Sequence, residues 1–127
     1  MTAICILVVD DNATNLRLAS EVLELDGFEV LRAVDAEQAL TSVSTRRPDL
    51  VLMDIALPGM DGLDLTRMLK GDPAFASLPI VALSAFAMKG DEQRALAAGC
   101  DGYITKPIDT RVFGSQVRAF LAAGSTT

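Results

Sequence analysis

The most informative absence in this chain of 127 residues is histidine, which does not occur at all. Without an imidazole the chain has no histidine general base and no histidine nucleophile. Zinc sites that rely on histidine ligands are excluded for the same reason. Any chemistry must therefore come from carboxylates, hydroxyls, amines or thiols.

Cysteine is scarce, and the two that occur, Cys5 and Cys100, lie far apart without the spacing of a metal site. Two such thiols are typical of a reducing compartment, so we expect a cytoplasmic protein. One structural disulfide between them stays open at this stage.

Long apolar runs and an excess of basic residues are also missing. No segment approaches the ~18 apolar residues that a membrane-spanning helix needs, and no secretory leader is recognisable. Acidic residues outnumber basic ones by 17 to 11, which gives a net charge of −6. Because the many phosphates of nucleic acids and acidic membranes are bound by clustered Lys and Arg, we expect neither nucleic acid nor a membrane as a partner.

The chain does contain a regular alternation of short apolar runs with helix-like stretches. The runs are CILVV (5–9), EVLRAV (29–34), LVLM (50–53), IVAL (80–83) and GYIT (102–105). Three of them are apolar nearly throughout, as is typical of parallel strands covered on both faces. The stretches between them carry apolar residues three or four positions apart. We therefore expect one α/β domain over 1–127, with five βα units in a doubly wound parallel sheet and no output domain.

Polar residues and glycines mark where the helices begin and end. Glycines are expected after helices, and Asx or Thr residues as helix N-caps. The expected caps are Asn12, Asp35 and either Asp109 or Thr110, and the expected helix-ending glycines are Gly27 and Gly99.

Polar side chains gather where the predicted strands end. Asp10 and Asp11 follow the first strand and Asp54 follows the third. Ser84 follows the fourth strand, and Lys106 comes after the fifth. Because open parallel sheets bind their ligands at the carboxyl ends of the strands, we expect these side chains to share one site.

Three carboxylates in one pocket repel each other unless a cation neutralises them. Mg²⁺ prefers oxygen ligands and typically uses one or two carboxylates together with a phosphate group. With Mg²⁺ bound, one carboxylate can act as a nucleophile toward a phosphoryl group, while Lys106 and the Ser84 hydroxyl contact its oxygens.

Four segments, LVVDDN, DLVLMDIALPGMDGLDL, PIVALSA and GYITKPI, resemble the response-regulator receiver domain of bacterial two-component signalling. They occur in the order and at the spacing of that family, across essentially the whole chain. The resemblance implies a flavodoxin-like fold with strand order 2-1-3-4-5. It also implies a signalling protein that catalyses only its own phosphorylation and dephosphorylation.

The same resemblance assigns the acidic residues. Asp54 would accept a phosphoryl group from a histidine kinase or a histidine phosphotransferase. Asp11 and Asp54 would bind Mg²⁺ directly, with the backbone carbonyl of Ala56 as a third protein ligand. Asp10 would contribute through a water molecule.

Further roles follow for the residues of the later strands. Lys106 would pair with Asp54 or with the phosphoryl group, and Ser84 would be the switch hydroxyl. Tyr103 would be the switch aromatic that reports to the last helix–strand–helix face; otherwise it is an edge-strand aromatic with its hydroxyl in water. Pro107 would follow a cis peptide bond.

A narrower likeness, carried by SAFAMKGDE (84–92) and DDNATN (10–15), is to single-domain regulators of the DivK type, which act by contacting other proteins. A bacteriophytochrome kinase and a cell-cycle kinase both fit as phosphodonor. A monomer and a homodimer both fit as the oligomeric state.

Three other interpretations remain. The chain could be a receiver-shaped interaction module that works without phosphate. An aspartate-nucleophile phosphatase usually needs a cap domain and Asp-x-Asp spacing, whereas Asp10 and Asp11 are adjacent here. A flavin-binding flavodoxin needs a phosphate loop after the first strand, where DDNATN presents two anions instead.

The segment LPGMDGLDL (57–65) is either a turn that brings backbone N–H groups to the site or an ordinary connection.

Overall fold

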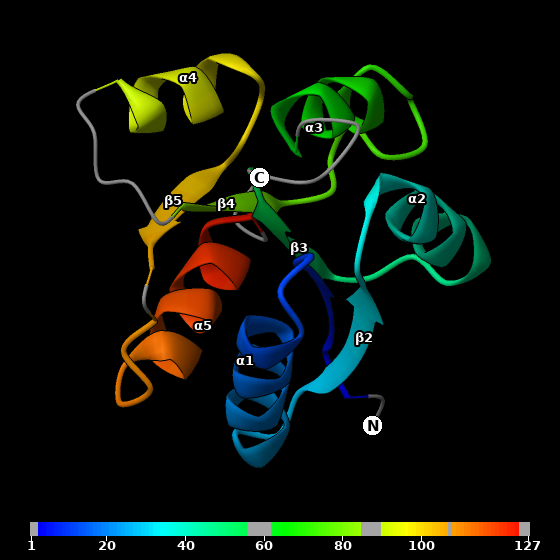
Figure 1. The fold of residues 1–127 in the computed structure, drawn as a ribbon. Helices are drawn as coiled ribbons and strands as arrows, with labels where there is room; N and C mark the ends of the chain where they lie inside the picture. Colours follow the sequence, from blue (N-terminus) through cyan, green and yellow to red (C-terminus); the bar gives the residue numbers. More distant parts are fainter. Residues whose placement is uncertain (1–2, 56–61, 85–89, 107, 125–127) are drawn as a thin grey trace.

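The computed structural model describes residues 3–55, 62–84, 90–106 and 108–124, in which five strands alternate with five helices (Figure 1). The strands are β1 (Cys5–Val9), β2 (Glu29–Ala33), β3 (Leu50–Asp54), β4 (Ile80–Ser84) and β5 (Gly102–Thr105). The helices are α1 (Ala13–Leu25), α2 (Ala36–Thr45), α3 (Gly62–Lys70), α4 (Asp91–Ala97) and α5 (Phe113–Gly124).

The strands form one sheet in the order β2-β1-β3-β4-β5, and each pairing is parallel. This confirms the doubly wound, flavodoxin-like α/β fold that the sequence predicted. The chain places β2 on one side of β1 and all later strands on the other side. Strands β1 and β3 are therefore neighbours at the point where the order of the strands switches side. Their carboxyl ends form the switch point at which such folds bind ligands.

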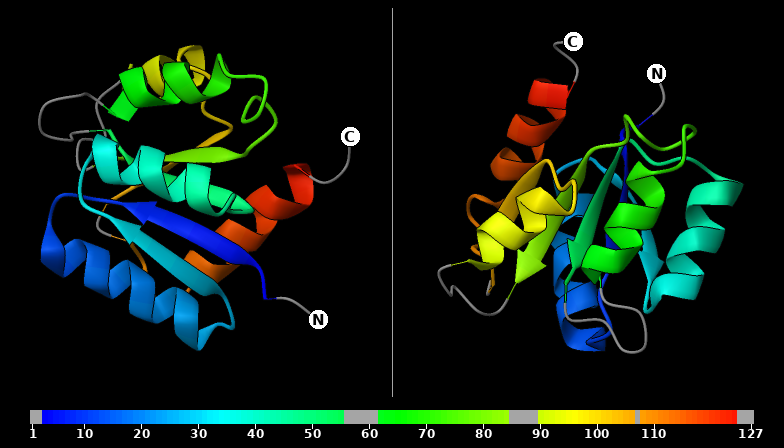
Figure 2. Two further views of the ribbon diagram at one scale, coloured as in Figure 1. Left: turned by 90° about the vertical axis from the view of Figure 1, so that its right-hand side faces the viewer. Right: turned by 90° about the horizontal axis from the view of Figure 1, so that it is seen from above.

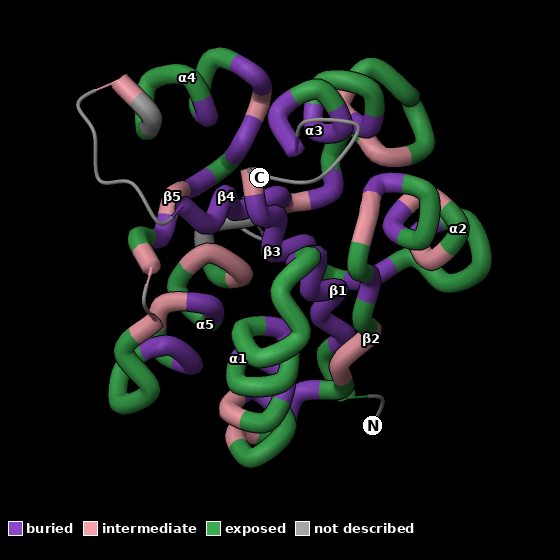
Figure 3. The backbone as a smooth tube through the Cα atoms, viewed as in Figure 1, coloured by how far each residue is buried: buried purple, intermediate pink, exposed green. Residues whose placement is uncertain are grey.

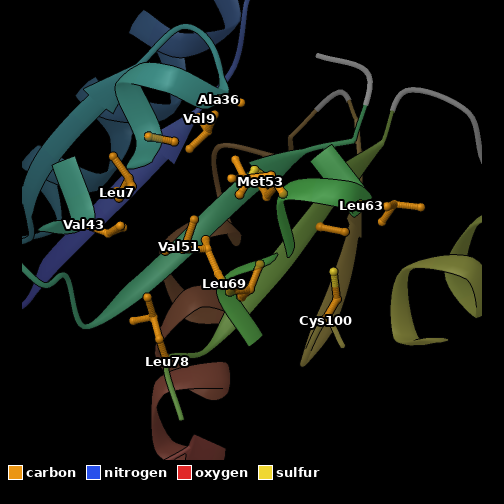
Figure 4. Packing of buried hydrophobic residues seen from close by; sticks show 14 of the residues in the cluster. Leu7, Val9, Ala36, Val43, Val51, Met53, Leu63, Leu69, Leu78 and Cys100 are labelled. Carbon is orange, nitrogen blue, oxygen red and sulfur yellow. The ribbon is translucent and has the colours of Figure 1, made fainter. Parts of the chain in front are cut away.

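The helices cover both faces of the sheet (Figures 1 and 2). Helices α2, α3 and α4 form one layer, the α2–α4 layer, and α1 and α5 form the other, the α1–α5 layer. Alternate side chains of a strand point to opposite faces. Leu7 and Val9 of β1 therefore pack in the α2–α4 layer, whereas Ile6 and Val8 pack in the α1–α5 layer. Figure 3 shows the resulting burial of the sheet, and Figure 4 shows the side chains of the α2–α4 layer.

The helix boundaries agree with the predicted caps, except at the last helix. The side chain of Asn12 accepts a hydrogen bond from the backbone N–H of Asn15, and the side chain of Asp35 accepts one from Gln38. Gly27 and Gly99 adopt positive φ angles of 95° and 108° after their helices, where other residues are strained.

Helix α5 begins at Phe113, later than the prediction. The Asp109 side chain instead accepts a hydrogen bond from the N–H of Arg111, in the turn before the helix. Val112 consequently precedes α5 and is exposed. Leu96 is exposed as well, because the short helix α4 buries Ala95 against the sheet.

A hydrogen-bond network around Lys70, the last residue of α3, lies at the amino ends of β4 and β5. Its ammonium donates to the carbonyl oxygen of Leu78 at 2.7 Å and to Asp101 Oδ2 at 2.8 Å. The same Asp101 oxygen accepts the N–H of Ile80 at 2.9 Å. The network joins α3, the start of β4 and the segment before β5.

Helix α5 is attached to the end of α1 through Arg118. Its guanidinium donates to the Asp26 carbonyl oxygen at 2.8 Å and lies 5.2 Å from the centre of the Phe28 ring. The ion pair between Arg118 and the Asp26 carboxylate completes the contact at 2.6 Å.

Both cysteines are buried and free, so they form no disulfide with each other. None of the helices in the described ranges combines the length and the apolar character that a membrane crossing requires.

Candidate functional site

The backbone brings acidic residues together at the switch point of the sheet. Asp10 directly follows β1, and Asp54 is the last residue of β3. The parallel register pairs Val9 with Met53, so the next residues, Asp10 and Asp54, occupy neighbouring positions. Carboxylate oxygens of Asp10, Asp11 and Asp54 all lie within 4.8 Å of one another.

Lys106 reaches this cluster from the end of β5. Its ammonium donates to Asp10 Oδ2 at 2.7 Å and to Asp54 Oδ2 at 3.2 Å. The side chain of Lys106 is 13% exposed, and Asp10 and Asp54 are 2% and 5% exposed. All three groups are thus largely removed from water, where a charge–charge interaction is strongest.

Burial and hydrogen bonding act in opposite directions on this pair. Burial raises the pKa of the Asp10 carboxyl above its usual range, against the hydrogen bonds from Lys106 and from the Asn12 N–H, which lower it. Burial lowers the pKa of Lys106, but the hydrogen bond to Asp10 and the charge of Asp54 outweigh that effect and raise it. The ammonium of Lys106 therefore stays charged at neutral pH.

The residues present fit a divalent cation. Among the described residues, three carboxylates face one ammonium at this edge, which leaves negative charge in excess. Asp11 is exposed, so the cluster is accessible from the surface on that side. Clustered carboxylate oxygens are the ligands that Mg²⁺ prefers. The carbonyl of Ala56 and the peptide bond to Pro107 lie outside the described residues.

Ser84 and Tyr103 lie on the neighbouring strands. Ser84 is the last residue of β4 and is 1% exposed, and its carbonyl oxygen accepts the N–H of Lys106 at 2.6 Å. Tyr103 pairs with Ala82 in the ladder between β4 and β5 and is half-buried against the α2–α4 layer. The backbone of Lys106 is thus fixed to the strand end that carries Ser84.

A comparison with known protein families identifies the arrangement. Residues 6–118 match the response regulator receiver domain. The chain belongs to this family. It is therefore a receiver domain of two-component signalling, as its motifs had suggested, and the cluster of acids and Lys106 occupies the carboxyl edge of a receiver fold.

Curated relatives narrow the comparison. The polar-differentiation response regulator DivK of Brucella anthropi is 40% identical over 116 residues, which cover 91% of this chain and 94% of the relative. DivK of Brucella ovis shows the same identity and coverage. The resemblance to regulators of the DivK type is thus confirmed.

Solved structures show the same fold. The receiver domain of a signal transduction histidine kinase from Syntrophus aciditrophicus superposes with a TM-score of 0.87 at 34% identity, covering 98% of this chain and 95% of that one. The receiver domain of NtrX from Brucella abortus gives a TM-score of 0.85 at 32% identity, covering 92% and 98%.

Two features of the site could not be read from the sequence. The first is the contact between Lys106 and Asp10, which are 96 positions apart and carry no local signal for each other. The second is the hydrogen bond from the Asn12 N–H to Asp10 Oδ1 at 2.9 Å. The Asx-turn tendency of aspartate is the one signal that points to it.

Proposed function

We propose that Asp54 accepts a phosphoryl group from a partner histidine kinase or histidine phosphotransferase, and that the phosphorylated protein signals to a downstream protein. The observation that supports this most directly is the position of Asp54. Its side chain is 7% exposed, and its carboxylate lies 3.2 Å from the ammonium of Lys106 and within 4.8 Å of two further acids.

Asp11 and Asp54 would hold Mg²⁺ directly, together with the carbonyl of Ala56, and Asp10 would hold it through water. When bound, Mg²⁺ would neutralise the charge that the carboxylates and the phosphoryl group bring together.

The transfer itself exchanges one bond for another. An oxygen of Asp54 forms a bond to phosphorus as the bond from phosphorus to the donor's histidine nitrogen breaks. The electron pair of the broken bond stays on that nitrogen. Lys106 moves from the carboxylate to a phosphoryl oxygen, which its position 3.2 Å from Asp54 supports.

The signal would then travel through Ser84 and Tyr103. The Ser84 hydroxyl would turn to a phosphoryl oxygen, and Tyr103 would repack, so that the surface formed by α4, β5 and α5 changes. The shared backbone contact between Ser84 and Lys106 supports this coupling. We place the protein in the cytoplasm, where histidine kinases present their phosphohistidines, as a monomer or a homodimer.

The decisive experiment is labelling with a small phosphodonor such as acetyl phosphate in Mg²⁺ buffer. We expect one phosphoryl group per chain in the wild type and none in Asp54→Asn. Asp64→Asn is the matched control, because Asp64 is an exposed acid on α3 that pairs only with Arg67 among the described residues. Labelling that persists in Asp54→Asn refutes the proposal.

The donor and the alternatives need two more measurements. A phosphotransfer profile against the histidine kinases of the host, taken at short times, identifies the kinase; the DivK relatives make a polar-differentiation kinase the first to test. Beryllofluoride serves here as a mimic of the phosphoryl group. If the chain binds its protein partner equally well with and without this mimic, an interaction module that works without phosphate is favoured. Turnover of a generic phosphate ester favours a phosphatase.

A further inference from the structure

We infer that Gly62 is a positioning residue for the phosphoacceptor: the absence of a side chain at this position sets where the backbone of Asp54 lies. The inference rests on the proposed function, since it concerns how Asp54 reaches its reactive position. Gly62 is the first residue of α3, and it lies directly against the end of β3.

The space beside Gly62 is filled by the backbone that carries Asp54. A Cβ atom at Gly62 would lie 2.2 Å from the carbonyl oxygen of Asp54 and 2.8 Å from the Cα of Ile55. Both distances are far shorter than real contacts between such atoms. Neither atom belongs to a flexible side chain, so relief requires that β3 and α3 move apart.

Gly102 shows the contrast. A Cβ there would also lie 2.2 Å from its nearest neighbour, but that neighbour is the ring of Phe120, which can rotate or shift. Positive φ is not the reason for glycine at position 62, because the glycines with positive φ are Gly27, Gly90 and Gly99. Close approach to Asp54 is therefore the specific requirement at Gly62.

Helix α3 is held too firmly to retreat. Leu63, Leu65 and Leu69 are at most 2% exposed and belong to the same buried cluster as Met53 and Val51 of β3, part of which is drawn in Figure 4. The Thr66 hydroxyl donates to the carbonyl oxygen of Gly62 at 2.9 Å. The N–H of Gly62 points to the carbonyl oxygen of Ile55 at 3.3 Å.

A side chain at position 62 would therefore displace Asp54 and Ile55 rather than α3. Asp54 is the last residue of its strand, with β4 as a ladder partner, so its carboxylate would turn away from Lys106 and the other acids. Misplacement of a reacting group by about 1 Å can slow a reaction ~10²-fold.

The test measures phosphorylation rate and stability separately in Gly62→Ala. Phosphorylation by acetyl phosphate at saturating Mg²⁺ is followed at a temperature where circular dichroism shows full folding. We expect a rate ~10²-fold below that of the wild type. In Gly71→Ala, at the other end of α3, the new Cβ would lie 3.2 Å from the carbonyl oxygen of Arg67, so the wild-type rate should remain.

A general loss of stability is controlled by Val43→Ala. Val43 is 2% exposed on α2 in the same layer and is not a member of the acidic cluster, so this variant should lose stability but keep its rate per folded molecule. A folded Gly62→Ala with a wild-type rate overturns the inference. A wild type that cannot be phosphorylated overturns the proposed function instead.

If Gly62→Ala does not fold, Thr66→Val keeps the glycine and removes the hydrogen bond to its carbonyl oxygen. A rate that falls several-fold more than in Val43→Ala at equal folded fraction supports the inference. A rate equal to that of Val43→Ala overturns it.

Discussion

Two largely buried lysines lie at opposite ends of the sheet and differ in the number of carboxylates around their ammonium groups. Lys70, at the amino ends of the strands, donates to one carboxylate and to carbonyl oxygens of Leu78 and Ala76. Its partner Asp101 in turn accepts the N–H of Ile80. Lys106, at the carboxyl ends, donates to two carboxylates, and a third lies within 4.8 Å of them.

The difference separates a structural ion pair from a reactive one. Lys70 and Asp101 balance each other's charge, and each also forms hydrogen bonds to backbone groups. At the Lys106 end the described carboxylates outnumber the ammonium, and under the proposed function this excess of negative charge would favour a cation and then a phosphoryl group.

The largest contrast is in phosphorylation rate. Lys106→Met should slow phosphorylation of Asp54 by acetyl phosphate ~10²–10³-fold, because a preorganised cation aimed at the phosphoryl oxygens is lost. Lys70→Met should keep the wild-type rate per folded molecule. Equal rates in the two variants would show that the two ends do not differ in this way.

The next contrast is in the response to Mg²⁺. A ligand that binds only the folded state at one hundred times its Kd stabilises it by ~2.7 kcal/mol. We expect Mg²⁺ to raise the Tm of the wild type and of Asp101→Asn by a similar amount. The increment should largely vanish in Asp11→Asn. An unchanged increment in Asp11→Asn would remove Asp11 from the cation site.

The third contrast concerns the free energy of unfolding, which at the Lys70 end should not depend on Mg²⁺. Lys70→Met should lower the free energy of unfolding by ~1–3 kcal/mol, because the Leu78 carbonyl and the Asp101 carboxylate lose a donor. Urea unfolding should show the same loss with and without Mg²⁺. A loss that Mg²⁺ restores would mean that the two ends are coupled.

The smallest effect concerns the thiols at the amino ends of the strands. Burial raises the pKa of both Cys5 and Cys100 in the folded protein. The unfolded thiols ionise near pH ~8.5, so their contribution to stability is complete below that pH and is lost as the pH rises toward the folded pKa values. Urea unfolding at pH 7.5 and 9.5 should therefore show a smaller decline in Cys5→Ala/Cys100→Ala than in the wild type. An equal decline would assign it to other groups.

Much of the fold was predictable because each strand and helix carries its own signal. The apolar runs gave the strands to within one residue, and Asn12 and Asp35 cap the helices they were expected to cap. The expected apolar faces of the helices fail at Leu96 and Val112, which are exposed. Apolar residues there match a helical period, but the short α4 and the late start of α5 leave them in water.

The sequence predicted that Asp10, Asp11, Asp54 and Lys106 meet at one edge, where the structure places them, but it did not predict their contacts. Parallel strands share one carboxyl edge, so the meeting of Asp10 with Asp54 follows from the order of the strands. The choice of Asp10 as the closer partner of Lys106 depends on tertiary geometry at a separation of 96 positions. The tight approach of Gly62 to Asp54 is likewise invisible in sequence, where the same glycine looked like part of a turn.

The contact between Lys106 and Asp10 also bears on how the protein is made. It joins the first strand to the residue after the last strand, so it forms only when nearly the whole chain has been synthesised and β5 has paired with β4. A nascent or truncated chain therefore lacks its lysine and the full reactive edge. Under the proposed function, competence for phosphorylation would arise together with the completion of folding, and partly folded chains would not take phosphoryl groups from a kinase.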